Sequence, residues 1–115
     1  MGDLNSVRRC LEQGEPINAQ DAKGMTALMW AVDQRQLPVV RCLVEHKANL
    51  NLVDQYGQTA LILAAGRNDT ASLQLLIEAK ADLNIKMVTG LTALGVAVEN
   101  HQIEAAALLK KARAK

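Results

Sequence analysis

Apolar residues recur along the chain in short blocks of helical spacing, separated by polar segments that contain glycine. The stripe of one such block comprises Val39, Val40, Leu43 and Val44. Side chains three and four positions apart share one face of a helix, so this spacing predicts a helix with one buried face. We expect one helix over about 27–34 and a second that begins at Leu37 and Pro38, because proline is tolerated in the first turn of a helix.

The same blocks return at a fixed interval. Gly24, Gly57 and Gly90 each follow the last by 33 residues, and Thr26, Thr59 and Thr92 keep the same step. A period of this size is typical of a solenoid, in which each unit buries its apolar face against its neighbours. The chain is therefore predicted to be all-α.

The register divides residues 1–115 into units of one domain. It predicts a half repeat over 1–20 that contains only a second helix, about Leu4 to Gln13, then repeats over 21–53 and 54–86 and a C-terminal capping repeat over 87–115. Turns are expected at Asp21 to Gly24, Asp54 to Gly57 and Met87 to Gly90, since aspartate and glycine are favoured at the ends of such turns. Thr26 is placed to cap the helix that follows it.

Helix ends show one irregular feature. Gly14 stands where a left-handed residue ends a helix at little cost, but Lys47 and Lys80 occupy the corresponding place in the next units. We expect both lysines to adopt the left-handed conformation. This conformation costs roughly 1 kcal/mol for a residue with a side chain.

Particular residues in this frame resemble a known family. The segments GMTALMWAV, GQTALILAA and GLTALGVAV resemble the signature of ankyrin repeats, with alanine in place of the usual proline in all three. VVRCLVEHKANLN and LQLLIEAKADLN are similar to the second helix and closing asparagine of that family. The resemblance implies an ankyrin-repeat α-solenoid of helix-turn-helix units with hairpin-like turns between them, and a module that binds proteins without catalysis or a cofactor.

The resemblance also implies a partner-binding face made of the hairpin tips and the exposed side of the first helices. Carried over by register, it comprises Ala22, Lys23, Met25, Asp33, Gln34, Gln55, Tyr56, Gln58, Arg67, Val88, Thr89, Leu91, Glu99 and Asn100. Apolar residues stand in register along one edge of this face, at Met25, Tyr56, Val88 and Leu91. Trp30 could pack into the core or line the groove, and the core is the favoured interpretation.

Composition narrows the classes of partner. Half of the residues are hydrophobic and 22% are charged, which is globular usage. The formal net charge of +1 gives no overall field that would attract nucleic acid or an anionic membrane. One Trp, one Tyr and no Phe leave no aromatic platform for stacking bases. No apolar run is long enough for a membrane span and no signal peptide is apparent, so we expect a cytoplasmic protein, with a nuclear location also open.

Candidate chemistry is sparse. Cys42 and His46, four positions apart on one helix, have spacing that suits two zinc ligands, but the sequence offers no second pair. We therefore expect no metal and no catalytic site, and we interpret Cys10 and Cys42 as buried thiols and not as a disulfide. The basic residues Lys110, Lys111, Arg113 and Lys115 are interpreted as a solvated cap on the last repeat.

Three interpretations of function remain open at this point. The favoured one is protein binding, and the alternatives are a structural, engineered or ancestor-like array without a dedicated ligand and a regulatory or inhibitory segment of a larger protein. The missing first helix of the half repeat also predicts an open end. Leu28, Met29 and Trp30 would then be exposed there, so we expect a monomer or weak self-association through the N-terminal end.

Overall fold

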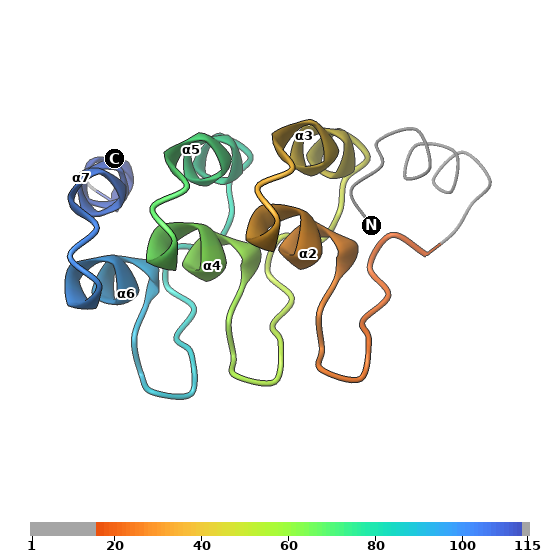
Figure 1. Cartoon of the computed structure of the whole chain (residues 1–115), viewed down its shortest axis with the longest axis horizontal. Helices are drawn as coiled ribbons and strands as arrows, with labels where there is room; N and C mark the ends of the chain where they lie inside the picture. Colours follow the sequence, from red (N-terminus) through yellow and green to blue (C-terminus); the bar gives the residue numbers. More distant parts are fainter. Residues whose placement is uncertain (1–15, 114–115) are drawn as a thin grey trace.

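Residues 16–113 of the chain are described by a computed structural model, and they form three helix pairs that follow one another in chain order (Figure 1). The inner helices are α2 (Ala27–Asp33), α4 (Ala60–Gly66) and α6 (Ala93–Glu99), and the outer helices are α3 (Leu37–Glu45), α5 (Thr70–Glu78) and α7 (Ile103–Arg113). No strand occurs between residues 16 and 113. The predicted all-α solenoid is therefore confirmed for this range, while the predicted helix from Leu4 to Gln13 lies outside the described residues.

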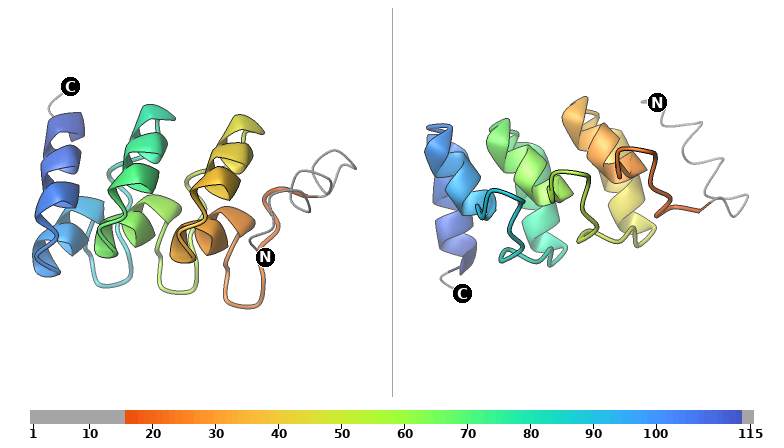
Figure 2. Two further views of the ribbon diagram at one scale, coloured as in Figure 1. Left: turned by 45° about the horizontal axis from the view of Figure 1, so that its top comes forward. Right: turned by 90° about the horizontal axis from the view of Figure 1, so that it is seen from below.

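The elements are arranged in three rows. Figures 1 and 2 show the outer helices in one row, the inner helices in a second row, and the loops before the inner helices extending away from both. We call these loops finger 1 (residues 16–26), finger 2 (residues 46–59) and finger 3 (residues 79–92). Each inner helix lies between its outer helix and the base of its finger, so the fingers and inner helices together form one continuous face.

Turn and cap residues place the fingers and helices as the sequence predicts. The N–H of Gly24 donates to the Asp21 carbonyl at 2.9 Å, and the equivalent bonds close the turns at Gly57 and Gly90. All three glycines have a positive φ, between 78° and 90°. The hydroxyl of Thr26 accepts a hydrogen bond from the Met29 N–H at 3.2 Å, and Thr59 and Thr92 cap α4 and α6 in the same way.

Within residues 16–113, five residues other than glycine adopt the left-handed conformation at helix ends. They are Arg35, Lys47, Asn68, Lys80 and His101, with φ between 53° and 73°. The expectation for Lys47 and Lys80 is confirmed, while Gly14 lies outside the described residues. Asn68 differs from the others, because its amide donates to Glu104 and its Oδ1 accepts from the Ala105 N–H at 3.2 Å, which joins α7 to the preceding repeat.

The core runs along the stack between the two rows of helices. Ala31, Ala64 and Ala97 occupy equivalent positions on the inner helices and are at most 5% exposed, so small side chains there allow neighbouring helices to approach closely. Leu28 and Met29 are 2% and 1% exposed, and both belong to the same buried cluster as Val40 and Leu43. The expectation that Leu28 and Met29 would be exposed at an open end is therefore wrong.

Successive fingers contact one another through their backbones. The Gln55 N–H donates to the Lys23 carbonyl and the Val88 N–H donates to the Tyr56 carbonyl, both at 2.9 Å. A Cβ atom added to Gly24 would lie 2.9 Å from the Asp54 Cα, and one added to Gly57 would lie 3.0 Å from the Met87 Cα. A Cβ added to Gly90 would meet no atom within 4 Å. The first two glycines therefore serve both the turn and the approach of the next finger, whereas Gly90 serves the turn alone.

This difference predicts unequal effects of alanine at equivalent positions. Gly90→Ala should reduce the free energy of unfolding by about 1–2 kcal/mol, the cost of a positive φ. Gly24→Ala carries the same cost and also forces finger 2 away, so it should reduce the free energy of unfolding by about 2–5 kcal/mol. Urea denaturation of the two variants measures this difference, and equal losses would contradict the close packing of the fingers.

Glycine substitutions at the left-handed residues should change the free energy of unfolding in opposite directions. Lys47→Gly and Lys80→Gly should each raise the free energy of unfolding by up to roughly 1 kcal/mol, because glycine relieves the backbone strain. Asn68→Gly should lower it by about 1 kcal/mol, since two hydrogen bonds to α7 are lost and asparagine tolerates this conformation well. Thermal or chemical denaturation of these variants gives the sign directly, and a stabilising Asn68→Gly would show that its side-chain bonds contribute nothing.

Candidate partner-binding groove

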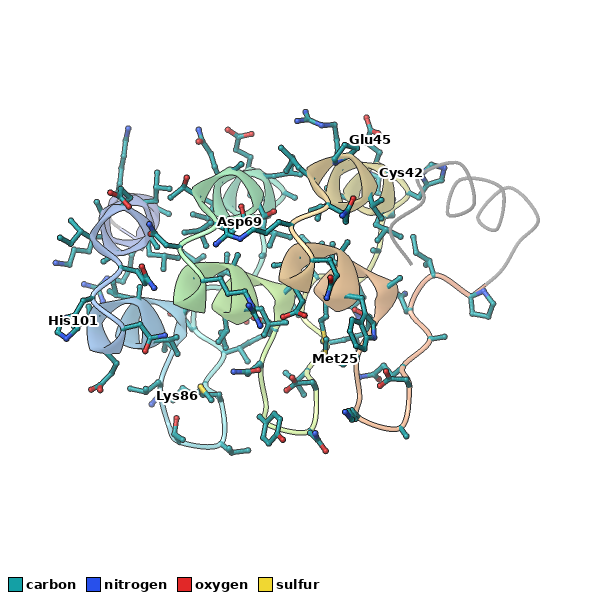
Figure 3. The ribbon with its side chains drawn as sticks, viewed as in Figure 1. Met25, Cys42, Glu45, Asp69, Lys86 and His101 are labelled. Carbon is teal, nitrogen blue, oxygen red and sulfur yellow. The ribbon has the colours of Figure 1, made fainter. Side chains whose placement is uncertain are left out.

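A groove of about 230 Å³ lies between fingers 1 and 2 and the inner helices α2 and α4. We call it the finger groove, and it is lined by Lys23, Met25, Trp30, Asp33, Asp54, Gln55, Tyr56, Gln58, Leu63 and Arg67. Seven of these residues belong to the face predicted from the sequence: Lys23, Met25, Asp33, Gln55, Tyr56, Gln58 and Arg67. Figure 3 shows Met25 below α2, near the base of finger 1. The structure thus brings the second-repeat and third-repeat parts of that face together in one concave surface.

Asp21 fixes the wall of the groove on the side of finger 1. One of its carboxylate oxygens accepts hydrogen bonds from the Lys23 and Met25 N–H groups, both at 2.9 Å. The other accepts a hydrogen bond from the Trp30 indole nitrogen at 3.2 Å. These hydrogen bonds, led by that from Met25 and followed by those from Trp30 and Lys23, lower the pKa of the Asp21 carboxyl below its ordinary value, because they favour the charged form.

The indole of Trp30 is consequently part of the groove. Its side chain is partly buried and lies beside Met25 and Leu63 in the groove lining. The favoured expectation that Trp30 packs into the core is therefore wrong. The hydrogen bond to Asp21 explains the outcome, since an indole N–H removed from water needs an acceptor and finger 1 supplies one at the groove.

Asp54 plays the corresponding part in finger 2. Its Oδ1 accepts hydrogen bonds from the Tyr56 and Gln58 N–H groups, both at 2.9 Å. Asp54 itself is only 9% exposed. The phenol ring of Tyr56 remains 54% exposed, so the fixed turn presents it at the edge of the groove.

Charges at the back of the groove are largely paired. The Arg67 guanidinium forms an ion pair with the Asp33 carboxylate, which joins the ends of α4 and α2. Arg35 also donates to the Arg67 carbonyl at 2.6 Å. Arg67 is half exposed, so the pair contributes at most about 1 kcal/mol to stability. The pair also holds the planar Arg67 guanidinium beside Asp33 in the lining of the groove.

The remaining predicted residues lie elsewhere. Gln34 and Glu99 are exposed at the ends of α2 and α6, and Val88 and Thr89 are exposed on finger 3. Leu91 is partly buried and packs against the core, and the Asn100 amide donates to the Gly66 carbonyl at 3.3 Å. Leu91 therefore has a packing role, Asn100 links the ends of α6 and α4, and the fourth repeat does not contribute to the finger groove.

Sequence reasoning missed two lining residues, Leu63 and Asp54, and gave the groove only as the less favoured position of Trp30. The sequence could have identified Asp54 as a groove residue, because the register places it at the same turn position as Asp21. Leu63 and Trp30 share one position on successive inner helices, 33 residues apart, so correct placement of either would have found both.

The finger groove offers contacts for binding, with apolar surface from Met25, Trp30, Tyr56 and Leu63 beside amide and charged groups. Its lining residues include no histidine, cysteine, serine or threonine. Away from the groove, Cys42 is buried on α3 and the His46 Nδ1 lies 2.8 Å from the Cys42 carbonyl oxygen. Within residues 16–113, no three His, Cys, Asp or Glu side chains gather closely enough to hold a metal ion. Cys10 lies outside the described residues.

None of the described helices is both long and apolar enough to cross a membrane. This finding concerns the same residues as the fold, 16–113.

Comparison with known proteins agrees with the fold. The family described as ankyrin repeats in three copies matches residues 1–87 and 46–115 of this chain. The chain is also similar to two proteins of Arabidopsis thaliana, acyl-CoA-binding domain-containing proteins 1 and 2, at 40% and 36% identity over 47 residues. That segment is 41% of this chain but only 14% and 13% of the two relatives, so the likeness concerns a small part of each.

The family match covers the whole sequence, and its repeat unit corresponds to the helix pairs and fingers of the structure. By sequence and by fold, this chain belongs to the ankyrin repeat family.

Proposed function

We propose that the chain is a non-catalytic module that binds a protein partner through the finger groove. Ankyrin repeats generally act as protein-binding modules, and this groove supplies a surface of the right kind. The observation that carries the proposal is the position of the aromatic residues. The chain has one Trp, one Tyr and no Phe, and both aromatic residues line the finger groove.

Residue type strengthens this argument. Trp, Tyr and Arg are the residues most enriched among those that dominate the binding energy of protein interfaces. Trp30 lies on α2, Tyr56 on finger 2 and Arg67 directly after α4, yet all three line one concave surface. Turns and hydrogen bonds hold Trp30 and finger 2 in place, so binding would cost little conformational entropy.

The size of the groove indicates the kind of ligand. Its volume of about 230 Å³ is below the roughly 300–1,000 Å³ of pockets that enclose drug-sized molecules. It suits one bulky apolar side chain of a partner, placed against Trp30 and Met25, with flanking backbone groups near Gln55 and Gln58. We therefore favour a protein segment over a small-molecule ligand.

The two alternative functions predict different behaviour. An array without a dedicated ligand would show no binding that depends on Tyr56 or Trp30. A regulatory segment of a larger protein would bind through the same groove, but its ligand would be another part of its own parent chain. We do not propose that this chain binds acyl-CoA, the ligand in the names of the two plant relatives, because the likeness covers only a small part of those proteins.

If a partner binds through the groove, Tyr56→Ala should strongly weaken the affinity for it. Peptides selected from a displayed random library on the wild-type chain should bind this variant about tenfold more weakly, since an exposed aromatic anchor is worth roughly 1–2 kcal/mol. Isothermal titration calorimetry with purified peptides measures the change. Tyr56 is exposed, so circular dichroism should show an unchanged fold.

Gln74→Ala provides the matched control, because Gln74 is an exposed residue of α5 outside the groove lining. Its affinity for the selected peptides should equal that of the wild type. If Tyr56→Ala also binds as well as the wild type, the finger groove is not the binding site.

A further inference from the structure

Most large apolar side chains of the described residues are buried, and five remain exposed: Val53, Tyr56, Val88, Val98 and Ile103. The first three belong to fingers. Val98 in α6 and Ile103 in α7 are the two that lie on helices, and both belong to the last repeat. Ile103 is 80% exposed, so this apolar surface is unusual for a helix of a folded domain.

The residues at equivalent positions in the earlier repeats are buried between helix pairs. Val32 and Ala65 stand 66 and 33 residues before Val98, and both are 0% exposed, whereas Val98 is 54% exposed. Val40 and Leu73 are likewise 0% exposed, but Ala106 at the same place is only partly buried. In the second and third repeats this face is therefore an interface, covered by the next helix pair.

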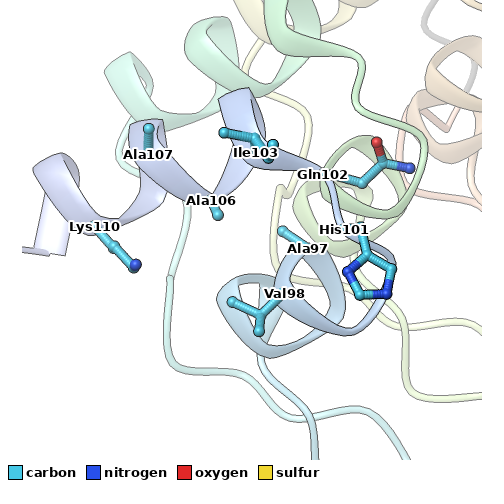
Figure 4. Close-up of a pocket in the computed structure, with 8 residues that line it drawn as sticks. All are labelled: Ala97, Val98, His101, Gln102, Ile103, Ala106, Ala107 and Lys110. Atoms are coloured by element: carbon cyan, nitrogen blue, oxygen red, sulfur yellow. The ribbon is translucent and has the colours of Figure 1, made fainter.

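The exposed face contains a groove of about 410 Å³. Figure 4 shows Val98 on α6, His101 in the following turn, and Ile103, Ala106, Ala107 and Lys110 along α7. The four α7 residues fall at i, i+3, i+4 and i+7 and so form one stripe of the helix. We call this surface the end face.

We propose that the end face binds a second copy of this chain, end face to end face, with the two α7 helices antiparallel across a two-fold axis. Continuity with the repeat interfaces supports the use of this face as an interface, because the equivalent faces of the two preceding helix pairs are each buried against the next pair. Two-fold contacts between identical surfaces are the commonest kind in soluble oligomers.

A head-to-tail arrangement is disfavoured by the opposite end of the described stack. It would require an exposed apolar receptor face on α2, but Leu28 and Met29 are 2% and 1% exposed. Among residues 16–113, the end face thus has no exposed apolar counterpart on α2, which favours a contact between two end faces. Our proposal therefore places self-association at the C-terminal end of the stack, whereas the sequence predicts a monomer or weak self-association through the N-terminal end.

The charges on the stripe are compatible with antiparallel packing. The two-fold axis would pass between Ala106 and Ala107, so Ile103 of one copy lies opposite the aliphatic stem of Lys110 of the other. The two Lys110 side chains are then about seven residues apart along the helices, or roughly 10 Å. At physiological ionic strength this is beyond the screening length of about 8 Å, so their repulsion is weak.

Sedimentation equilibrium of the full chain from low micromolar to several hundred micromolar tests the proposal. The apparent mass should rise from 12.4 kDa toward twice that value with concentration, and added salt should not reverse the rise. Ile103→Lys changes both halves of the interface, so dimerisation should weaken by at least about thirtyfold. Circular dichroism should show the fold unchanged, since Ile103 is exposed.

Val88→Lys is the matched control, because it adds the same charge at a residue that is 71% exposed on finger 3. This variant should dimerise like the wild type. A wild type that stays at 12.4 kDa over the whole range would overturn the proposal, as would a dimer that Ile103→Lys leaves intact.

Discussion

The close approach of each finger to the one before it is the constraint on which the rest of this structure depends. At Gly24 and Gly57 the neighbouring backbone occupies the space of a side chain, and a backbone hydrogen bond spans each pair of fingers. The inner helices are only seven residues long, which is too short for stable isolated helices. Their stability must come from contacts between repeats, as expected for a solenoid whose units interact only with their neighbours.

The same contacts determine which surfaces are available for binding. Where fingers 1 and 2 meet, hydrogen bonds to Asp21 and Asp54 hold Trp30 and the backbone of Tyr56 in the lining of one groove. Finger 3 lacks the aspartate, with Met87 in its place, and it forms no part of that groove. Beyond finger 3, a Cβ on Gly90 would meet open space and Val98 is exposed, so a face that is buried in earlier repeats becomes an end face.

The sequence predicts the repeat frame well because each of its signals is local. Glycine with a positive φ, threonine caps and left-handed lysines all depend on a few neighbouring residues, and all occur where the period places them. The groove could be predicted only in part, since its lining depends on contacts between repeats. An apolar residue on a helix usually packs into the core, so the sequence favours the core for Trp30, and periodicity does not reveal the hydrogen bond of Trp30 to Asp21 in the finger. The burial of Leu28 could not be foreseen for a similar reason, because it depends on three-dimensional packing.

Amide hydrogen exchange at Gln55 and Val88, measured by nuclear magnetic resonance, tests the central claim most directly. Both residues are exposed, so protection of their N–H groups must come from the bonds to Lys23 and Tyr56 in the preceding finger. The Thr89 N–H, which finds no acceptor among residues 16–113, provides an unprotected reference. The account predicts that Gln55 and Val88 exchange much more slowly than Thr89. Exchange of all three at the same rate would show that the fingers do not pair, and would contradict the account.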